Sequence, residues 1–346
     1  MGEHAAVYGC PAVVATLGLR CAVSVERRED SIVSLDLRDI AIRCESTWNE
    51  LGEYAMQARR RWSTYAAQPT PANFASLRGP DPAHLVKIVV GEVALRIPTH
   101  RFSGMALTLR SAIPVGAGFG SSAAVAVSVA AALLAAGGDR PAERHIGEIA
   151  LEAERRQHGQ PSGIDHNTVL FGGVIRATRN EAGVLRIDPI EERSPSVQRL
   201  LQHCSVYHTG PATESTGAVV TAVSRHFNGA DSRLLHTMTR TTNDLLAQME
   251  ASAARPERFV EIVRHYEACL ELLGVVPQYV RQAIRAVEEA GGAAKICGAG
   301  SISGDGAGAL LVVWPGEPPD PLPLQLRCLH RISEPLAVPG LSVETA

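Results

Sequence analysis

A glycine-rich stretch that leads into an alanine-rich helix, residues 114–136, constrains the fold of this chain more than any other feature. Residues 107–109 alternate as in a strand, Pro114 ends the strand, and an apolar helical pattern begins at Ser121. Glycine lets backbone N–H groups turn toward an anion, and the first N–H groups of a helix have no internal partners. The stretch therefore predicts a phosphate-binding loop between a strand and a helix. Its glycines are Gly116, Gly118 and Gly120.

Two well-known glycine motifs do not fit this loop. A P-loop requires lysine and then serine or threonine directly after its last glycine, whereas Gly120 is followed by Ser121 and Ser122. A dinucleotide-binding fingerprint requires its third glycine where this chain has Ser121. Alternatively, the loop binds no ligand and is only a turn that caps a buried helix. The sequence of the loop alone leaves both interpretations open.

The sequence around the loop resembles a known family. IPVGAGFGSSAA at residues 113–124 is similar to the central phosphate-binding motif of the GHMP kinases, which include galactokinases, homoserine kinases, mevalonate kinases and phosphomevalonate kinases. The longer run from Ser111 is most similar to the mevalonate kinases. Three further segments resemble family motifs in the family's order: GEHAAVYGCP at 2–11, EAERRQHGQPSGIDHNTVLFGG at 152–173 and KICGAGSISGDGAGAL at 295–310.

Length and pattern indicate two domains. With 346 residues, 45% of them hydrophobic, the chain is long enough to bury two cores. A strand-rich start, alternating helices and a second β-α half predict an α+β fold. The resemblance implies a two-domain GHMP kinase-like fold, with a left-handed β-α-β unit in the N-terminal domain, a ferredoxin-like C-terminal domain and the active site between them. We place the boundary in the polar stretch 191–197, which gives domains 1–195 and 196–346.

Hydrophobic patterns predict the individual elements. The stretches 68–81 and 158–168 are punctuated by proline and glycine and are predicted to be loops. Strands are predicted over 5–25, 31–43, 105–111, 169–177, 183–188, 204–210, 293–297, 309–314 and 326–332, and helices over 46–67, 82–95, 121–136, 141–157, 213–228, 231–252, 256–272 and 278–289.

Charge and cysteine content exclude several classes of protein. The formal net charge is −3, so neither a nucleic acid nor a membrane surface is expected as a partner. The seven cysteines form no CxxC pair, which indicates reduced thiols in a cytoplasmic protein. The longest apolar run, 123–136, is too short to span a bilayer, and no signal-peptide pattern is present. Lys87 and Lys295 are the only lysines.

The resemblance implies that two glycine loops bind ATP. Because the overall charge is near balance, phosphate recognition has to be local. The implied contacts in the central loop are Pro114, Gly116, Ala117, Gly118, Phe119, Gly120, Ser121 and Ser122, and those in the third motif are Gly298, Ala299 and Gly300.

Phosphoryl transfer also needs a divalent cation. The resemblance implies Mg²⁺ with two protein ligands, Ser122 in the first turn after the central loop and Glu154 on the next helix. A hydroxyl, a carboxylate and phosphate oxygens suit Mg²⁺, which keeps several waters. From the residues alone, Ser122 could instead only cap its helix, and Glu154 could lie on a solvated helix face among charged neighbours.

Asp165 in the PSGID segment is the catalytic base that the resemblance implies. Pro161 and Gly163 can hold a short carboxylate rigidly, and a carboxylate can accept the proton of an attacking alcohol. The alternative is an aspartate that caps a turn.

The resemblance also implies residues that contact the acceptor substrate. Glu3 and His4 resemble the pair that lies beside the acceptor in GHMP kinases. Thr213 or Thr216 corresponds to a loop threonine near the acceptor, and we take Thr216 as the candidate.

Two motifs depart from the family pattern. The Pro-Gly-Lys segment that usually precedes Gly-Glu-His is absent before Gly2, and we expect the genomic sequence upstream of Met1 to encode it in frame. Without that lysine, the charged form of Asp165 is less favoured. The third motif is longer than the compact Gly-Ala-Gly-x-Gly-Gly of the family and contains Asp305.

These observations predict an ATP-dependent kinase that phosphorylates the terminal hydroxyl of mevalonate to 5-phosphomevalonate in isoprenoid synthesis. Residues 5–9 follow His4 as in mevalonate kinases, whereas Asp-Tyr follows closely in galactokinases. One alternative is another GHMP kinase with a phosphomevalonate, sugar or hydroxy-acid acceptor, and the other is a catalytically silent relative that binds a nucleotide or metabolite. Family members are often homodimers, so a homodimer is also expected.

Overall fold

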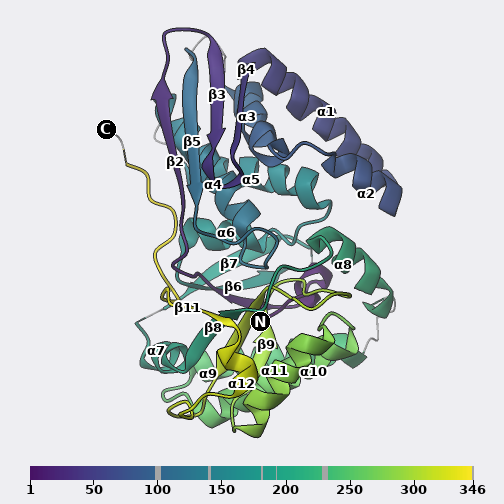
Figure 1. The fold of residues 1–346 in the computed structure, drawn as a ribbon, viewed down its shortest axis with the longest axis vertical. Helices are drawn as coiled ribbons and strands as arrows, with labels where there is room; N and C mark the ends of the chain where they lie inside the picture. The colour runs from purple at the N-terminus through teal and green to yellow at the C-terminus, as the bar shows by residue number, and fades with distance from the viewer. Residues whose placement is uncertain (98–102, 139–141, 181, 192, 228–232, 345–346) are drawn as a thin grey trace. The chain divides into compact units, whose positions relative to one another are not determined.

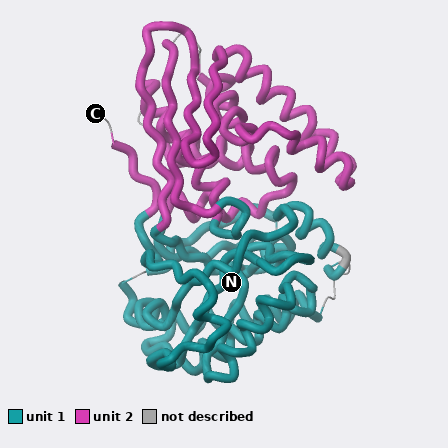
Figure 2. The backbone as a smooth tube through the Cα atoms, in the orientation of Figure 1, with its two compact units in different colours: residues 1–18, 115–119, 172–339 teal, residues 19–114, 120–171, 340–346 magenta. Residues whose placement is uncertain are grey.

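The computed structural model describes residues 1–97, 103–138, 142–180, 182–191, 193–227 and 233–344 (Figure 1). The predicted helix ends at 141, 228 and 231 lie outside the described residues. The chain divides into two compact units, each built from separated segments (Figure 2). The single boundary predicted between 195 and 196 stays a prediction. Unit 1 comprises 1–18, 115–119 and 172–339, and unit 2 comprises 19–114, 120–171 and 340–346.

Unit 2 contains a mixed sheet with the strand order β2-β5-β3-β4. β3 (Ile32–Leu37) pairs parallel with β5 (Met105–Ser111), and the chain between them includes β4 (Ile42–Thr47) and helices. β2 (Cys21–Arg27) and β4 pair antiparallel with β5 and β3, respectively. Buried positions alternate with more exposed ones in β3 and β5, so the helices cover one face of the sheet.

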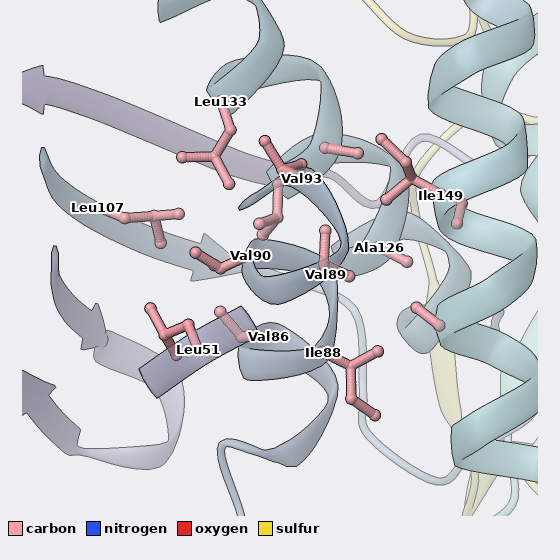
Figure 3. Close-up of a cluster of buried hydrophobic side chains, with 14 of the residues drawn as sticks. Leu51, Val86, Ile88, Val89, Val90, Val93, Leu107, Ala126, Leu133 and Ile149 are labelled. Atoms are coloured by element: carbon pink, nitrogen blue, oxygen red, sulfur yellow. The ribbon is translucent and has the colours of Figure 1, made fainter. Parts of the chain in front are cut away.

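The helices of unit 2 build its core on that face. They are α1 (Trp48–Ala67), α2 (Pro71–Arg78), α3 (His84–Arg96), α4 (Ser121–Ala136), α5 (Glu143–His158) and α6 (Ile164–Phe171). Val89 and Val93 of α3 lie between Leu107 of β5 and Ile149 of α5, as Figure 3 shows. These four side chains are buried. Apolar residues occupy most faces of α3, because other elements of the unit surround this helix.

Unit 1 contains two antiparallel sheets in its described residues. One has the order β1-β6-β7, made of β1 (Ala12–Ala15), β6 (Val174–Arg179) and β7 (Leu185–Ile190). The other has the order β11-β8-β10-β9, which corresponds to 4-1-3-2 when its strands are numbered along the chain. With helices between β8 and β9 and between β10 and β11, this is the ferredoxin-like arrangement that was predicted.

The remaining elements of unit 1 pack around the second sheet. The strands are β8 (Cys204–His208), β9 (Ala293–Ile296), β10 (Ala309–Val313) and β11 (His330–Ile332), and the helices are α7 (Pro195–Gln202), α8 (Thr216–Val223), α9 (Arg233–Glu250), α10 (Pro256–Leu272), α11 (Gln278–Glu289) and α12 (Leu324–Arg327). Tyr266 and Leu270 of α10 and Ile284 of α11 are buried against Ile296 and Leu310 of the sheet. The α+β class is thereby confirmed for both units.

Several local predictions were wrong, including the omission of α7 and the helical starts of the predicted strands 169–177 and 326–332. The predicted loop 68–81 contains α2, because Pro71 stands at the start of the helix, where proline is tolerated, and Thr70 caps it by accepting from Asn73 N. The predicted loop 158–168 runs into α6, whose Ile164 N donates to Ser162 Oγ. Residues 5–8 form a 3₁₀ turn and not a strand.

Among the described helices, none is long and apolar enough to cross a membrane.

Candidate functional site

The predicted site residues fall into two groups, one in each unit. Pro114, Gly120, Ser121, Ser122, Glu154 and Asp165 belong to unit 2, and Glu3, His4, Gly116, Ala117, Gly118, Phe119, Thr216, Gly298, Ala299 and Gly300 belong to unit 1. The central glycine loop thus connects the units, since the chain passes from unit 1 to unit 2 between Phe119 and Gly120.

In unit 2, three side chains converge at the N-terminus of α4. Gly120 has a φ of 71° and precedes the helix, and Ser122 lies in its first turn. The Ser122 hydroxyl donates to Glu154 Oε1 at 2.5 Å and contacts His158 Nε2 at 2.9 Å. Glu154 and His158 stand four residues apart on α5, so both face the same side of that helix. Ser122 therefore has specific partners that a helix cap would not need, which favours the functional interpretation.

The carboxylates of this group lack a cation. Glu154 is 2% exposed, and burial, followed by the negative charge of Asp165, raises its pKa to about 8. The side chain of Asp165 is open to solvent, yet the protein around it reduces its hydration and raises its pKa. Within the described residues, neither carboxylate forms an ion pair, so no cationic side chain there stabilises the ionised form of either group.

This donor set fits Mg²⁺ bound together with a nucleotide. The described residues contain no cluster of three or more His, Cys, Asp or Glu side chains that could hold a metal by themselves. Mg²⁺ commonly takes one or two carboxylates and completes its shell with waters and phosphate oxygens. Ser122 and Glu154 could ligate it, and its charge would remove the repulsion that raises the pKa of Glu154.

In unit 1, the central loop packs directly on the third glycine loop. Ala309 N donates to Ala117 O at 2.9 Å. A Cβ on Gly118 would lie 2.8 Å from Cys297 O, and one on Gly308 would lie 2.2 Å from Ala117 O. These glycines are therefore required for close backbone approach. Gly116 differs, because it has a φ of 70° and a Cβ there would meet no atom within 4 Å.

The first motif is anchored on the third loop by a buried ion pair. Lys295 Nζ donates to Glu3 Oε1 at 2.5 Å, and His4 Nε2 contacts Ala299 O at 2.9 Å. Burial would raise the pKa of Glu3, but the charge of Lys295 outweighs it and lowers the pKa to about 2. Glu3 Oε2 and His4 Nδ1 are buried and have no hydrogen-bond partner among the described residues. Such atoms are ready to bind a polar ligand.

The extended third motif holds a neighbouring loop. Glu214 accepts from Ser301 Oγ at 2.5 Å, from Ser303 Oγ at 2.5 Å and from Ile302 N at 3.0 Å. Burial opposes ionisation of Glu214, but these hydrogen bonds outweigh it and lower its pKa. The extra residues of this motif therefore hold the loop that contains Glu214 through hydrogen bonds. Thr216, the predicted acceptor contact, is exposed at the start of α8.

Sequence reasoning missed two residues of these groups and the partner of a third. The spacing of Glu154 and His158 on one helix could have indicated His158 as a partner of the predicted metal ligands. Lys295 stood out as one of only two lysines, but the sequence did not predict its pairing with Glu3. Glu214 has no comparable signal in the sequence.

Comparisons with known proteins agree with the resemblance. Residues 84–173 match the family described as GHMP kinases N terminal domain. A mevalonate kinase of Candida albicans is 28% identical over 279 residues, which cover 68% of this chain and 60% of that protein. A mevalonate kinase of Archaeoglobus fulgidus is 27% identical over 92% of this chain and 90% of its own length. The match to the Bos taurus mevalonate kinase, 28% identical over 55% of this chain, spans only 54% of that protein.

Solved structures share the fold at lower identity. A mevalonate kinase of L. major in complex with R-mevalonate is 16% identical with a TM-score of 0.62, covering 99% of this chain and 94% of that one. A phosphomevalonate kinase of Streptococcus pneumoniae in complex with phosphomevalonate and AMPPNP is 14% identical with a TM-score of 0.61, covering 91% and 89%. A D-glycero-D-manno-heptose 1-phosphate kinase, 15% identical with a TM-score of 0.62, covers 99% and 93%. The predicted two-domain fold is confirmed.

Proposed function

This chain belongs to the GHMP kinases, with mevalonate kinases among its similar relatives, and we propose that it transfers the γ-phosphoryl group of ATP to the terminal hydroxyl of mevalonate. The products would be 5-phosphomevalonate and ADP. The observation that carries the proposal is the group formed by Ser122, Glu154 and Asp165, two carboxylates of raised pKa and a hydroxyl at a helix N-terminus. The same group, whatever the acceptor, supports a small-molecule kinase.

Asp165 is the residue that accepts the proton of the attacking hydroxyl. A raised pKa makes an aspartate a stronger base than it is in water, provided that it is ionised when the acceptor binds. Bound Mg²⁺ would supply positive charge that stabilises the phosphoryl group in transfer. Ser122 and Glu154 would hold it, and its charge would favour the ionised forms of both carboxylates.

The nucleotide phosphates have a suitable place along the central loop. Gly116 and Gly120 both have positive φ, and a side chain at either would meet open space. The free N–H groups of the first turn of α4 attract anions. Glu3 Oε2 and His4 Nδ1 are the polar atoms of unit 1 that we assign to the acceptor.

A second candidate is another acceptor alcohol within the same family. A sugar-phosphate kinase shares the fold as fully as a mevalonate kinase does, so fold does not separate these acceptors. The cytoplasmic location and the homodimer stay predictions.

The test is an ADP-release assay of the purified chain with Mg·ATP over mevalonate, phosphomevalonate, homoserine, galactose and shikimate. We expect turnover with mevalonate and at least about tenfold lower kcat/KM, about 1.4 kcal/mol, for the others. A different preferred acceptor would keep the kinase and replace mevalonate. Absence of ADP release with every acceptor would favour the silent relative. An Asp165→Asn sample serves as the control for contaminating kinases.

A further inference from the structure

His158 is the third side chain at the start of α4, beside Ser122 and Glu154, and the proposed reaction assigns it no role. Its Nε2 lies 2.9 Å from Ser122 Oγ, the same hydroxyl that donates to Glu154. Histidine at this place is therefore in direct contact with a proposed metal ligand, and it is partly buried in unit 2.

The proton count at Ser122 decides how His158 takes part. A serine hydroxyl has one proton and two acceptor lone pairs. When Glu154 is ionised, which a bound cation favours, it accepts that proton, and the bond to His158 then requires a proton on Nε2, with the imidazole as donor. One lone pair of Ser122 Oγ then accepts from His158, and the other stays available for a cation.

The surrounding fold holds His158 firmly. Gly159 ends α5 with a φ of 82°, and its carbonyl accepts from Trp62 Nε1 of α1 at 2.9 Å. A Cβ on Gly159 would lie 2.4 Å from the ring of Tyr65, so that ring occupies the space beside the turn. The turn that directly follows His158 is thus held against α1.

We propose that His158 is a positioning residue, which donates from Nε2 to Ser122 and keeps the free lone pair of that hydroxyl aimed at the divalent cation. The proposal rests on the proposed function in one respect, the assignment of Ser122 as a metal ligand. Partners that orient a metal ligand through hydrogen bonds affect metal affinity by about 10–100-fold when they are removed.

The first test measures metal binding without turnover. Mn²⁺ is titrated into the protein saturated with the non-hydrolysable nucleotide AMPPNP, and free Mn²⁺ is followed by electron paramagnetic resonance. We expect His158→Ala to weaken Mn²⁺ binding by about tenfold or more. His158→Gln, whose amide N–H can reach the place of Nε2, should stay within about threefold of the unchanged protein. His145→Ala is the matched control, since His145 is exposed on the same helix.

The outcomes separate this inference from the proposed function. Equal Mn²⁺ affinity in the His158→Ala and unchanged proteins overturns the positioning role, as does an equal loss in His158→Ala and His158→Gln. Failure of the unchanged protein to bind Mn²⁺ with nucleotide overturns the proposed function itself. Because no acceptor is present, a wrong choice of alcohol does not affect the result.

A second measurement addresses the proton directly. In protein labelled with ¹⁵N-histidine and saturated with Mg·AMPPNP, the Nε2 resonance of His158, assigned by its absence in His158→Gln, should have the shift of a protonated nitrogen at neutral pH. An unprotonated Nε2 would overturn the donor role even if the metal affinity fell.

Discussion

The two units each bury an acidic residue of the predicted site, and the two acids differ in how their charge is compensated. Glu3 in unit 1 pairs with Lys295, which lowers its pKa to about 2. Glu154 in unit 2 has a hydroxyl and a second carboxylate nearby and no cation among the described residues, and its pKa rises to about 8. The charge of the first acid is compensated within the folded chain, whereas we propose that the charge of the second is compensated by a cation from solution.

This difference separates a structural role from a functional one. A buried ion pair that is fully formed fixes the position of its segment, here the first motif against the third loop. A buried carboxylate without a cation costs stability, and such costs are typical of functional sites. We therefore interpret Lys295 as the anchor of the first motif.

The largest expected effect comes from breaking the complete pair. Lys295→Met leaves buried Glu3 with only the more distant N-terminal ammonium, 3.9 Å from its Oε1, and should lower the free energy of unfolding by about 3–5 kcal/mol, measured by urea denaturation. Because the pKa of Glu3 is lowered from 4.5 to about 2, its contribution is present above pH 4.5 and is lost as the pH falls toward 2. The control is Lys87→Met, a partly exposed pair with Asp81 that should cost less than about 1 kcal/mol. Equal losses for the two lysines would contradict the comparison.

The next effect concerns chemistry in unit 2. Asp165→Asn keeps the size of the side chain but cannot accept a proton, so kcat should fall by about 10²-fold or more while the KM for the acceptor changes little. Steady-state kinetics at saturating Mg·ATP measures both constants. Asp188→Asn, in a strand of unit 1, is the control and should leave kcat unchanged. Retention of more than about a tenth of the turnover would remove Asp165 as the base.

A smaller effect is expected in the pH dependence of stability. The pKa of Glu154 is raised in the folded chain, so its protonated form is favoured and its contribution is lost as the pH rises from 4.5 through about 8. The metal-free protein should therefore lose up to about 1.4 kcal/mol per pH unit in this range from this group. Glu154→Gln is always neutral and should flatten the curve, as should saturating Mg·AMPPNP in the unchanged protein. Parallel curves for Glu154→Gln and the unchanged protein would show that Glu154 titrates normally.

The smallest effect tests the open side of the central loop. Gly116→Asn preserves a positive φ, which asparagine tolerates, and places a side chain in the open space beside the loop. Calorimetry should give about tenfold weaker binding of AMPPNP, about 1.4 kcal/mol. Gly183→Asn has the same kind of φ and open surroundings in a distant turn, and it should bind as the unchanged protein does. Unchanged affinity in Gly116→Asn would separate this residue from the nucleotide.

The sequence predicted those elements whose pattern is local and strong. β5, α10 and α11 occupy the predicted ranges, because in each the alternating or helical hydrophobic pattern extends over the whole element and therefore indicates where it begins and ends. α2 and α6 were missed because proline and glycine at the start of a helix resemble a loop when capping is overlooked.

The sequence by itself determined the α+β class and the glycine loops, and its resemblance to a family predicted Ser122, Glu154 and Asp165 as site residues, since each rests on residues close together in the chain. Only the tertiary structure decided their partners. Lys295 reaches Glu3 across 292 positions of the chain, and Ser301 reaches Glu214 across 87. The pKa values depend on burial and on nearby charges, which arise when distant segments pack together. Whether the charge of a buried glutamate is compensated therefore depends on which side chains the fold brings to it.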